Sequence, residues 1–176
     1  MIGGCMRALA VVAGACVVLA VAGCGNGGQS GTSTTATRTL TPDQLWDPCS
    51  LPDAAVAATG VKADTKDANP FGSTTTGWKG CNWNNDTYYL SVFANNRTMD
   101  QVRSNTSFHN IHDVDVPGRK AVSYTEGSNN SCGLDFATSQ GVVEVIVRPS
   151  PGTPSTGDYC ATALNTAHSL NSLIPK

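Results

Sequence analysis

The sequence contains few charged residues and no basic segment. Of its 176 residues only 14% are charged, 11 of them basic and 13 acidic, and the formal net charge is −2. Proteins that bind nucleic acid or dock on acidic membranes usually carry clusters of Lys and Arg. The composition therefore disfavours both kinds of partner. Asn, Ser, Thr and Gly supply most of the polarity instead, as is common on extracytoplasmic surfaces.

Motifs for metal binding and nucleophilic catalysis are also missing. The cysteines form no CxxC pairs of the kind that bind zinc, and there is no G-x-S-x-G nucleophile elbow. His109, His112, Asp113 and Asp115 lie close in sequence, but no further ligand follows at a diagnostic spacing, so we interpret this segment as a polar surface loop. His168 lies beside the apolar stripe of a predicted helix and is expected to be partly buried. The sequence thus predicts no metal, cofactor or catalytic residue.

The apolar stretch at residues 8–22 is too short for a permanent membrane span. It has about 15 residues, whereas a spanning helix needs roughly 20. Arg7 precedes it, and it ends at Val21-Ala22-Gly23-Cys24. A positive start, an apolar core of this length and small residues at the cleavage point are typical of a secretory signal. The final four residues resemble a bacterial lipoprotein signal, in which the cysteine receives a diacylglyceryl group and becomes the first residue.

We therefore expect residues 1–23 to be removed and Cys24 to anchor the protein on the extracytoplasmic face of the cell membrane. The alternative is an ordinary signal peptide cut near Ala22, with the cysteine incidental. Two or three acyl chains on one cysteine hold a protein stably to a bilayer. After the anchor, the composition predicts a flexible Gly/Ser/Thr-rich tether at 24–44 and a single folded domain at 45–176.

The seven cysteines can be sorted by position. Cys5 and Cys16 leave with the signal and Cys24 carries the lipid, so the folded domain retains Cys49, Cys81, Cys132 and Cys160. An even set of four in an exported domain predicts two disulfides. We favour sequential pairing, Cys49 with Cys81 and Cys132 with Cys160, because it joins each terminal helix to a strand. Nested pairing, Cys49 with Cys160 and Cys81 with Cys132, is the alternative.

Periodicity and capping signals predict helices alternating with pairs of antiparallel strands. Helices are expected from Ser50 as N-cap, with Asp53 as its capping-box partner, to about Gly60, and at 98–105 and 158–173. Strands are expected at 80–84, 88–94, about 111–124 with a break at Pro117-Gly118, 132–137 and 142–147. Residues 62–76 are expected to form a loop. This order predicts an α+β fold, in which the N- and C-terminal helices pack on an antiparallel sheet of about four to five strands.

Several short motifs together resemble a known family. Asp47-Pro48-Cys49-Ser50-Leu51 opens a predicted helix, Cys81-Asn82-Trp83 lies in a strand, and Cys132 and Cys160 lie in a later strand and at the start of the last helix. Behind a lipoprotein signal, this pattern resembles the actinobacterial lipoprotein family called domain of unknown function 3558, from about Trp46 to the C-terminus. The resemblance implies a cell-envelope lipoprotein of mycobacteria and relatives, and it brings no established activity or catalytic residue.

Aromatic side chains are the best candidates for a binding surface, because they combine large contact area with polar edges. Trp78, Trp46 and Tyr89 are the candidates; Trp78 is expected to be exposed, whereas Trp83 is expected in the core. We expect a lipid-anchored domain that binds an envelope protein or lipid without catalysis. The alternatives are a carrier of an apolar ligand in a cleft between helices and sheet, and a cell-envelope hydrolase.

Overall fold

The computed structural model describes residues 40–70, 72, 76–127, 131–153 and 157–176. The predicted signal segment, Cys24 and the tether up to residue 39 lie outside these residues. The described elements are, in chain order, the 3-10 helices η1 (Pro42–Gln44) and η2 (Pro48–Ser50), α1 (Asp53–Ala57), β1 (Lys62–Asp67), β2 (Trp78–Asn84), β3 (Tyr88–Asn95), α2 (Met99–Arg103), β4 (Phe108–Val116), β5 (Arg119–Glu126), β6 (Ser131–Thr138), β7 (Gly141–Pro149) and α3 (Tyr159–Leu170).

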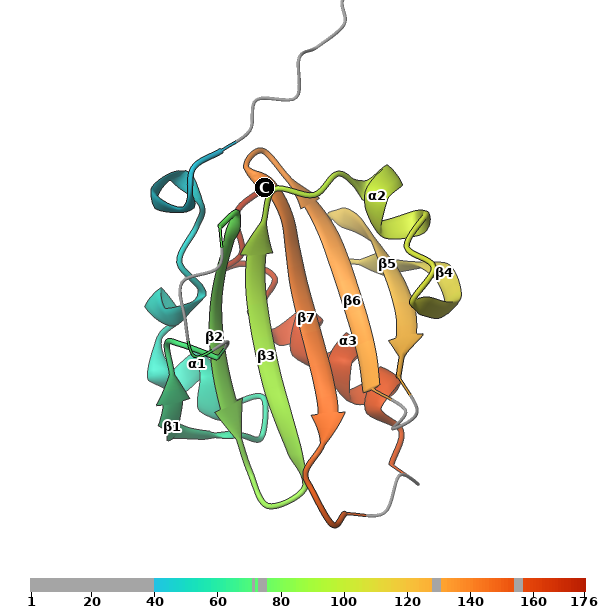
Figure 1. The fold of residues 1–176 in the computed structure, drawn as a ribbon. Helices are drawn as coiled ribbons and strands as arrows, with labels where there is room; N and C mark the ends of the chain where they lie inside the picture. Colours follow the sequence, from blue (N-terminus) through green and yellow to red (C-terminus); the bar gives the residue numbers. More distant parts are fainter. Residues whose placement is uncertain (1–39, 71, 73–75, 128–130, 154–156) are drawn as a thin grey trace, which may run out of the picture. The chain divides into compact units, whose positions relative to one another are not determined.

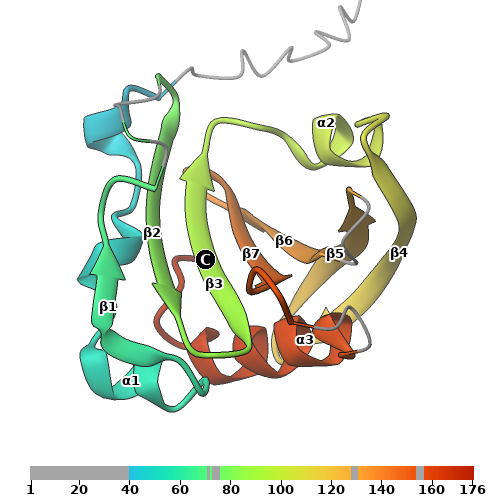
Figure 2. The same cartoon turned by 60° about the horizontal axis from the view of Figure 1, so that its bottom comes forward.

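The described strands form one antiparallel sheet in the order β1-β2-β3-β7-β6-β5-β4. Each half is a meander of consecutive strands, and the halves meet where β3 pairs with β7. Figure 1 shows α3 passing behind β6 and β7, and Figure 2 shows α1 and α3 on one side of the sheet and α2 on the other. The predicted α+β class is confirmed, although the sheet has seven strands where four to five are expected.

The central strands β3, β6 and β7 are buried on both faces along most of their length. Because side chains alternate between the faces of a strand, Val143, Val145 and Val147 point from β7 into the core beneath α3. The intervening side chains of β7 point to the opposite face. Trp83 is fully buried in the core beneath α3, as predicted.

The C-terminal helix α3 is held by a cap, an apolar stripe and a disulfide. The Asp158 side chain accepts a hydrogen bond from the Ala161 amide at 2.9 Å, which satisfies one of the unpaired donors of the first turn. Ala163, Ala167 and Leu170 recur at helical spacing and are fully buried. The Cys132–Cys160 disulfide joins the first turn of the helix to β6.

The second disulfide, Cys49–Cys81, joins η2 to β2, so the sequential pairing is confirmed. Two disulfides indicate an extracytoplasmic domain, because such bonds form and persist in oxidising compartments. None of the helices among the described residues combines the length and hydrophobicity needed to cross a membrane.

The predicted start of the first helix is wrong. Asp47, not Ser50, caps this region, by accepting a hydrogen bond from the Cys49 amide at 2.9 Å. Leu51 precedes Pro52, and both are extended, with ψ angles of 132° and 136°. A residue before proline is pushed out of the helical region by the proline ring. The chain therefore makes a 3-10 turn, stops, and begins α1 only at Asp53.

The edge strands of the sheet differ from the prediction. β1 lies within the predicted loop 62–76. β4 confirms the strand expected from about Ile111 and begins earlier, at Phe108, so the interpretation of the polar segment His109–Asp115 as a loop is wrong. Both carry charged side chains at positions where a buried strand would be apolar. Charges of this kind are common on edge strands, where they oppose pairing with other chains. By contrast, the predicted helix after Thr98 is confirmed as α2, with a complete capping box between Thr98 and Gln101.

We predict that removing the Cys132–Cys160 disulfide by a double substitution to alanine lowers the free energy of unfolding by about 3 to 4 kcal/mol, because the unfolded chain regains the freedom of a long loop. Removing Cys49–Cys81 is the matched comparison, since the two bridges span 28 and 32 residues. Urea unfolding followed by circular dichroism measures both. If the free energy of unfolding fell by less than about 1 kcal/mol in both double variants, neither bridge would constrain the unfolded chain as expected.

Candidate functional site

The face of the sheet opposite α3 brings three titratable side chains together. Asp135 on β6 lies directly opposite Glu144 on β7. Tyr124 on β5 lies opposite Gly133, one row further along the same face. Neighbouring rows on a sheet face are close enough for long side chains to meet. The strand register alone therefore places two acids and a phenol within reach of one another.

Gly133 makes room for the tyrosine ring. A Cβ atom at this position would lie 2.2 Å from Tyr124 Cζ, so any larger residue would displace the ring. The ring leans over the glycine and stacks on Phe108, with the ring centroids 3.7 Å apart. Its hydroxyl thereby reaches the row of Asp135 and Glu144.

The hydroxyl of Tyr124 contacts both acids. It lies 3.1 Å from Asp135 Oδ1 and also within hydrogen-bond distance of Glu144 Oε1. A tyrosine hydroxyl has only one proton to donate, and an ionised carboxylate has none. Two hydrogen bonds at this oxygen therefore need one protonated carboxyl group, which donates to Tyr124 Oη while the tyrosine donates to the other acid.

Burial indicates which acid holds the proton. Asp135 is 0% exposed and Glu144 3% exposed. Burial raises the pKa of Asp135 well above its ordinary value and the nearby charge of Glu144 raises it further, although the Tyr124 hydrogen bond and the charge of Arg97 lower it in part. Burial also raises the pKa of Glu144, but the Tyr124 hydrogen bond and the positive charge of Arg97 oppose that rise. The pKa of Asp135 is the more strongly raised of the two, so we assign the proton to Asp135 and the charge to Glu144.

Arg97, between β3 and α2, is the cation that faces this cluster. Its Nη1 lies 3.9 Å from Glu144 Oε1, and its guanidinium lies over the Trp78 ring at 4.5 Å from the centroid. Contacts between guanidinium groups and aromatic faces are attractive. The backbone amide of Arg97 donates to Asn95 Oδ1 at 3.0 Å. This hydrogen bond holds the backbone of Arg97 in position beside the cluster.

Arg97, Glu144 and Trp78 border a pocket of about 360 Å³, a volume in the range in which small ligands bind. Trp78 and Phe93 meet edge to face on one wall, with centroids 6.0 Å apart. Gly80 admits the Phe93 ring, since a Cβ atom there would lie 2.4 Å from Phe93 Cδ1. The complete lining is Pro70, Trp78, Asn82, Phe93, Arg97, Phe108, Glu126, Glu144, Ile146 and Arg148.

Several buried polar atoms on this side of the sheet have no hydrogen-bond partner within the described part of the chain. They are Asn82 Oδ1, Asn95 Nδ2, Arg97 Nη1 and Asp135 Oδ2. Buried polar groups in native proteins are nearly always paired, and each exception calls for an explanation. Asn82 and Arg97 line the pocket itself, so a polar group of a ligand can supply their missing partners.

The three predicted surface aromatics are distributed over both faces of the sheet. Trp78 is half-buried rather than exposed, because Arg97 and Phe93 cover part of its ring. Tyr89 lies on the same face and lines an adjoining pocket of about 320 Å³. Trp46 packs half-buried against the core on the α3 side. Only Trp78 and Tyr89 therefore share a surface.

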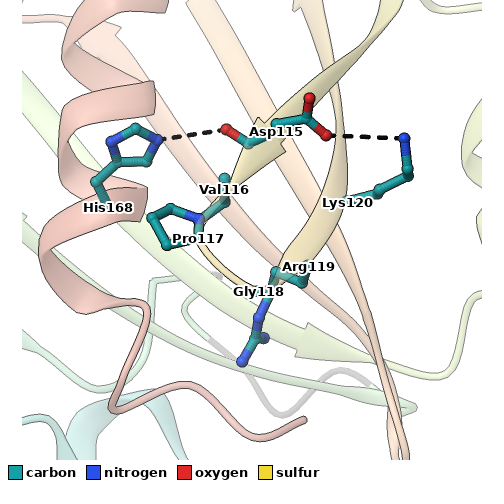
Figure 3. A pocket seen from close by; sticks show the side chains of 7 residues that line it. All are labelled: Asp115, Val116, Pro117, Gly118, Arg119, Lys120 and His168. Atoms are coloured by element: carbon teal, nitrogen blue, oxygen red, sulfur yellow. Dashed lines mark hydrogen bonds and ion pairs between the residues drawn. The ribbon is translucent and has the colours of Figure 1, made fainter.

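A larger but shallower pocket, of about 650 Å³, lies at the β4–β5 hairpin beside α3 (Figure 3). His168 is exposed there, so the predicted partial burial is wrong; its Nε2 lies 3.4 Å from the Asp115 carbonyl oxygen. The Asp115 carboxylate pairs with Lys120 at 3.7 Å, and both side chains are more than four-fifths exposed. Water screens such groups strongly, so this pocket is the weaker candidate.

The described residues contain no group of three or more His, Cys, Asp or Glu side chains placed to hold a metal ion. His109, His112 and Asp113 are exposed along β4. Asp113 is paired with Arg103 of α2, and that hydrogen bond lowers the pKa of the carboxyl group.

A comparison with protein-family models identifies the family of the chain. The model of the family described as "Protein of unknown function (DUF3558)" matches residues 19–171. The chain belongs to the DUF3558 family. The resemblance seen in the sequence is thereby confirmed, and the match extends over both disulfides and the whole pocket. No curated protein and no solved structure matches the chain, so the chemistry of this DUF3558 domain has to be derived from its own residues.

We predict that Asp135 makes this DUF3558 domain less stable as the pH rises. Because the pKa of Asp135 is higher in the folded than in the unfolded state, the folded protein binds more protons between the two values. Its free energy of unfolding therefore falls in this window by about 1.4 kcal/mol per pH unit. Asp135→Asn, whose amide can donate to Tyr124 as the protonated acid does, should remove that slope.

Urea unfolding of both proteins between pH 4.5 and pH 8 measures the effect. The difference in unfolding free energy between the natural protein and Asp135→Asn reports Asp135 together with its effect on the coupled Glu144, because the groups that do not interact with Asp135 contribute equally to both proteins. A difference that does not change with pH would contradict the assignment of the proton to Asp135.

Proposed function

We propose that this DUF3558 protein is a lipid-anchored cell-envelope protein whose domain binds a small ligand with a flat apolar body, in the pocket between Trp78, Phe93 and Phe108. The observation that carries the proposal is the combination of aromatic walls with buried, unpaired polar atoms. Ligand sites typically pair apolar walls with a few convergent polar groups. The pocket lies on the face opposite α3. The alternative hypothesis of a carrier placed the ligand in a cleft between helices and sheet, but the core fills the space beneath α3.

The aromatic walls are held in place by neighbouring side chains. Phe93 is seated over Gly80, and Phe108 is stacked on Tyr124. Arg97 lies over the Trp78 ring. A pocket whose walls are already ordered costs less conformational entropy to fill. A planar hydrocarbon body can therefore pack against these rings with little rearrangement.

The proposed lipid anchor determines in which compartment the domain can bind such a ligand. The segment Val21–Cys24 resembles a lipoprotein signal, and the two disulfides agree with export. A domain fixed to Cys24 by a short tether samples only the space near the outer face of a membrane. The proposed ligand is therefore a component of the cell envelope or a molecule passing through it.

We predict that the neutral probe 2-naphthamide binds the mature protein in lipid nanodiscs and that Trp78→Ala weakens this binding about tenfold, the upper part of the range for aromatic contacts. Isothermal titration calorimetry, with empty nanodiscs as the blank, measures the affinity. Trp46→Ala is the matched control, because Trp46 is also a half-buried tryptophan but lies on the other face. Equal losses in both variants, or no binding to the natural protein, would refute the pocket assignment.

We predict that the mature protein begins at Cys24 and carries a diacylglyceryl group on its sulfur. Mass spectrometry of the N-terminal peptide, from protein isolated out of membranes, measures this. The acylated peptide should be absent from a Cys24→Ser variant. A natural N-terminus elsewhere, or an unmodified thiol at Cys24, would contradict the anchor.

A further inference from the structure

Arg97 has spare hydrogen-bond donors at the pocket. A guanidinium carries five N–H donors, and the buried Nη1 has no hydrogen-bond partner within the described ranges. Glu144 lies 3.9 Å away, which is close enough for attraction but too far for a hydrogen bond. The group that satisfies a guanidinium best is a planar carboxylate, which accepts two parallel hydrogen bonds.

A second guanidinium lines the same pocket. Arg148 is four residues after Glu144 on β7 and so points to the same face, with Ile146 between them. Among the described residues its Nη2 makes only a long contact of 3.5 Å, to Ser91 Oγ, and most of its other donors make no hydrogen bond there. The two arginines therefore flank an apolar floor, which suits a ligand with a flat body and an acidic end.

The charges that line the pocket already cancel. Arg97 and Arg148 balance Glu126 and Glu144, because Asp135 behind them is neutral. An added anion leaves one excess negative charge beside a carboxylate that is only 3% exposed. Such a charge is costly in a buried site. Taking up one proton restores the balance.

Glu144 is the group placed to take that proton. Burial raises the pKa of Glu144 above its ordinary value, and the hydrogen bond from Tyr124 and the charge of Arg97 limit that rise. A carboxylate bound to Arg97 draws the guanidinium away from Glu144 and adds a like charge next to it, and both changes raise the pKa of Glu144.

Resting on the proposed function, we propose that the ligand of this pocket is an organic anion with a flat apolar body, an aromatic carboxylate in its simplest form, and that Glu144 takes one proton from solvent when it binds. The protonated Glu144 then donates to the ligand carboxylate. Asp135 donates to Tyr124 and Tyr124 to Glu144, so one unbroken chain of hydrogen bonds runs from the buried acid to the ligand.

The described titratable and charged side chains that face Glu144 come from four places in the fold. They are Tyr124, Glu126, Asp135, Arg97 and Arg148. Glu126 raises the pKa of Glu144 and so assists the uptake. On β3 the residue opposite Glu144 is Phe93, which does not titrate. The charged residues of α2, Asp100 and Arg103, are exposed.

The test compares 2-naphthoate with 2-naphthamide, which has the same shape but no charge. Calorimetry of the mature protein in nanodiscs, in two buffers of different ionisation enthalpy at pH 7, gives both the affinity and the number of protons taken up. We expect the carboxylate to bind about tenfold or more tightly than the amide, because of its charge-assisted hydrogen bonds. About one proton should enter with the carboxylate and none with the amide, and the carboxylate's affinity should fall by up to about tenfold per pH unit as the pH rises.

Variants separate the parts of the proposal. Glu144→Gln should bind 2-naphthoate without proton uptake and with a pH-independent affinity. Arg97→Gln should lose the preference for the carboxylate, whereas Arg103→Gln, an arginine outside the pocket, should keep it. Binding of 2-naphthamide shows in each variant that the pocket is still folded.

The outcomes distinguish this inference from the proposed function. Equal affinities for the two probes, or preference for the carboxylate without proton uptake, overturn the inference and leave the pocket as an aromatic binding site. Absence of binding by both probes overturns the proposed function and the inference with it.

Discussion

The fold depends on the register of β7 between β3 and β6. In this register Val143, Val145 and Val147 face the core under α3, and Glu144 faces the opposite side, across from Asp135. A slip by one residue would exchange the two faces. It would place a carboxylate in the apolar core and valines in the pocket, so both faces of the sheet enforce the same pairing. The site is a direct consequence of the register that forms the core.

The same register places the carboxyl groups of Asp135 and Glu144 side by side in a buried site, and protonation of one of them removes their repulsion. Two acids buried side by side repel each other and lose their hydration, and neither Asp135 nor Glu144 has an ion pair at hydrogen-bond distance among the described contacts. Tyr124 joins them only if one is neutral. Apolar residues of similar size would be expected to stabilise the sheet more. Perturbed titratable groups of this kind cluster at functional sites.

The stabilising elements lie on the other face of the sheet. The Cys132–Cys160 disulfide holds α3 against β6, on the strand that carries Asp135 on its opposite face. Bridges of this length contribute about 3 to 4 kcal/mol, which is large beside the 5 to 15 kcal/mol typical of a domain. The covalent links can thus offset a buried acidic pair that would be costly in a domain without them.

Features set by local pattern could be predicted from the sequence. The α3 helix follows from its Asp158 cap and apolar spacing, the β6–β7 hairpin from two apolar runs around a turn, and the disulfides from cysteine count and compartment. The edge strand β1 cannot be predicted from the pattern, because its Lys and Asp residues give no apolar alternation. An edge strand does not need apolar alternation, because neither of its two faces is fully covered by other elements.

The site could not be predicted, because it depends on register between strands. Asp135 and Glu144 stand out as acids within apolar runs, which was an available signal. Their proximity follows only once β6 and β7 are aligned residue by residue. The covering of Trp78 by Arg97 is likewise a contact between a strand and the connection that follows the next strand. Sequence patterns describe faces and ends of elements but not which side chains meet across them.

The most direct test of this account is the protonation of the two buried acids. Carbon-13 NMR of the side-chain carboxyl groups, titrated from pH 3 to pH 9 and assigned with Asp135→Asn and Glu144→Gln, observes each acid separately. The account predicts that the Asp135 carboxyl carbon keeps the chemical shift of the protonated form at pH 7. If both acids titrate at the ordinary value near about 4, the shared proton is absent and the account of the pocket fails.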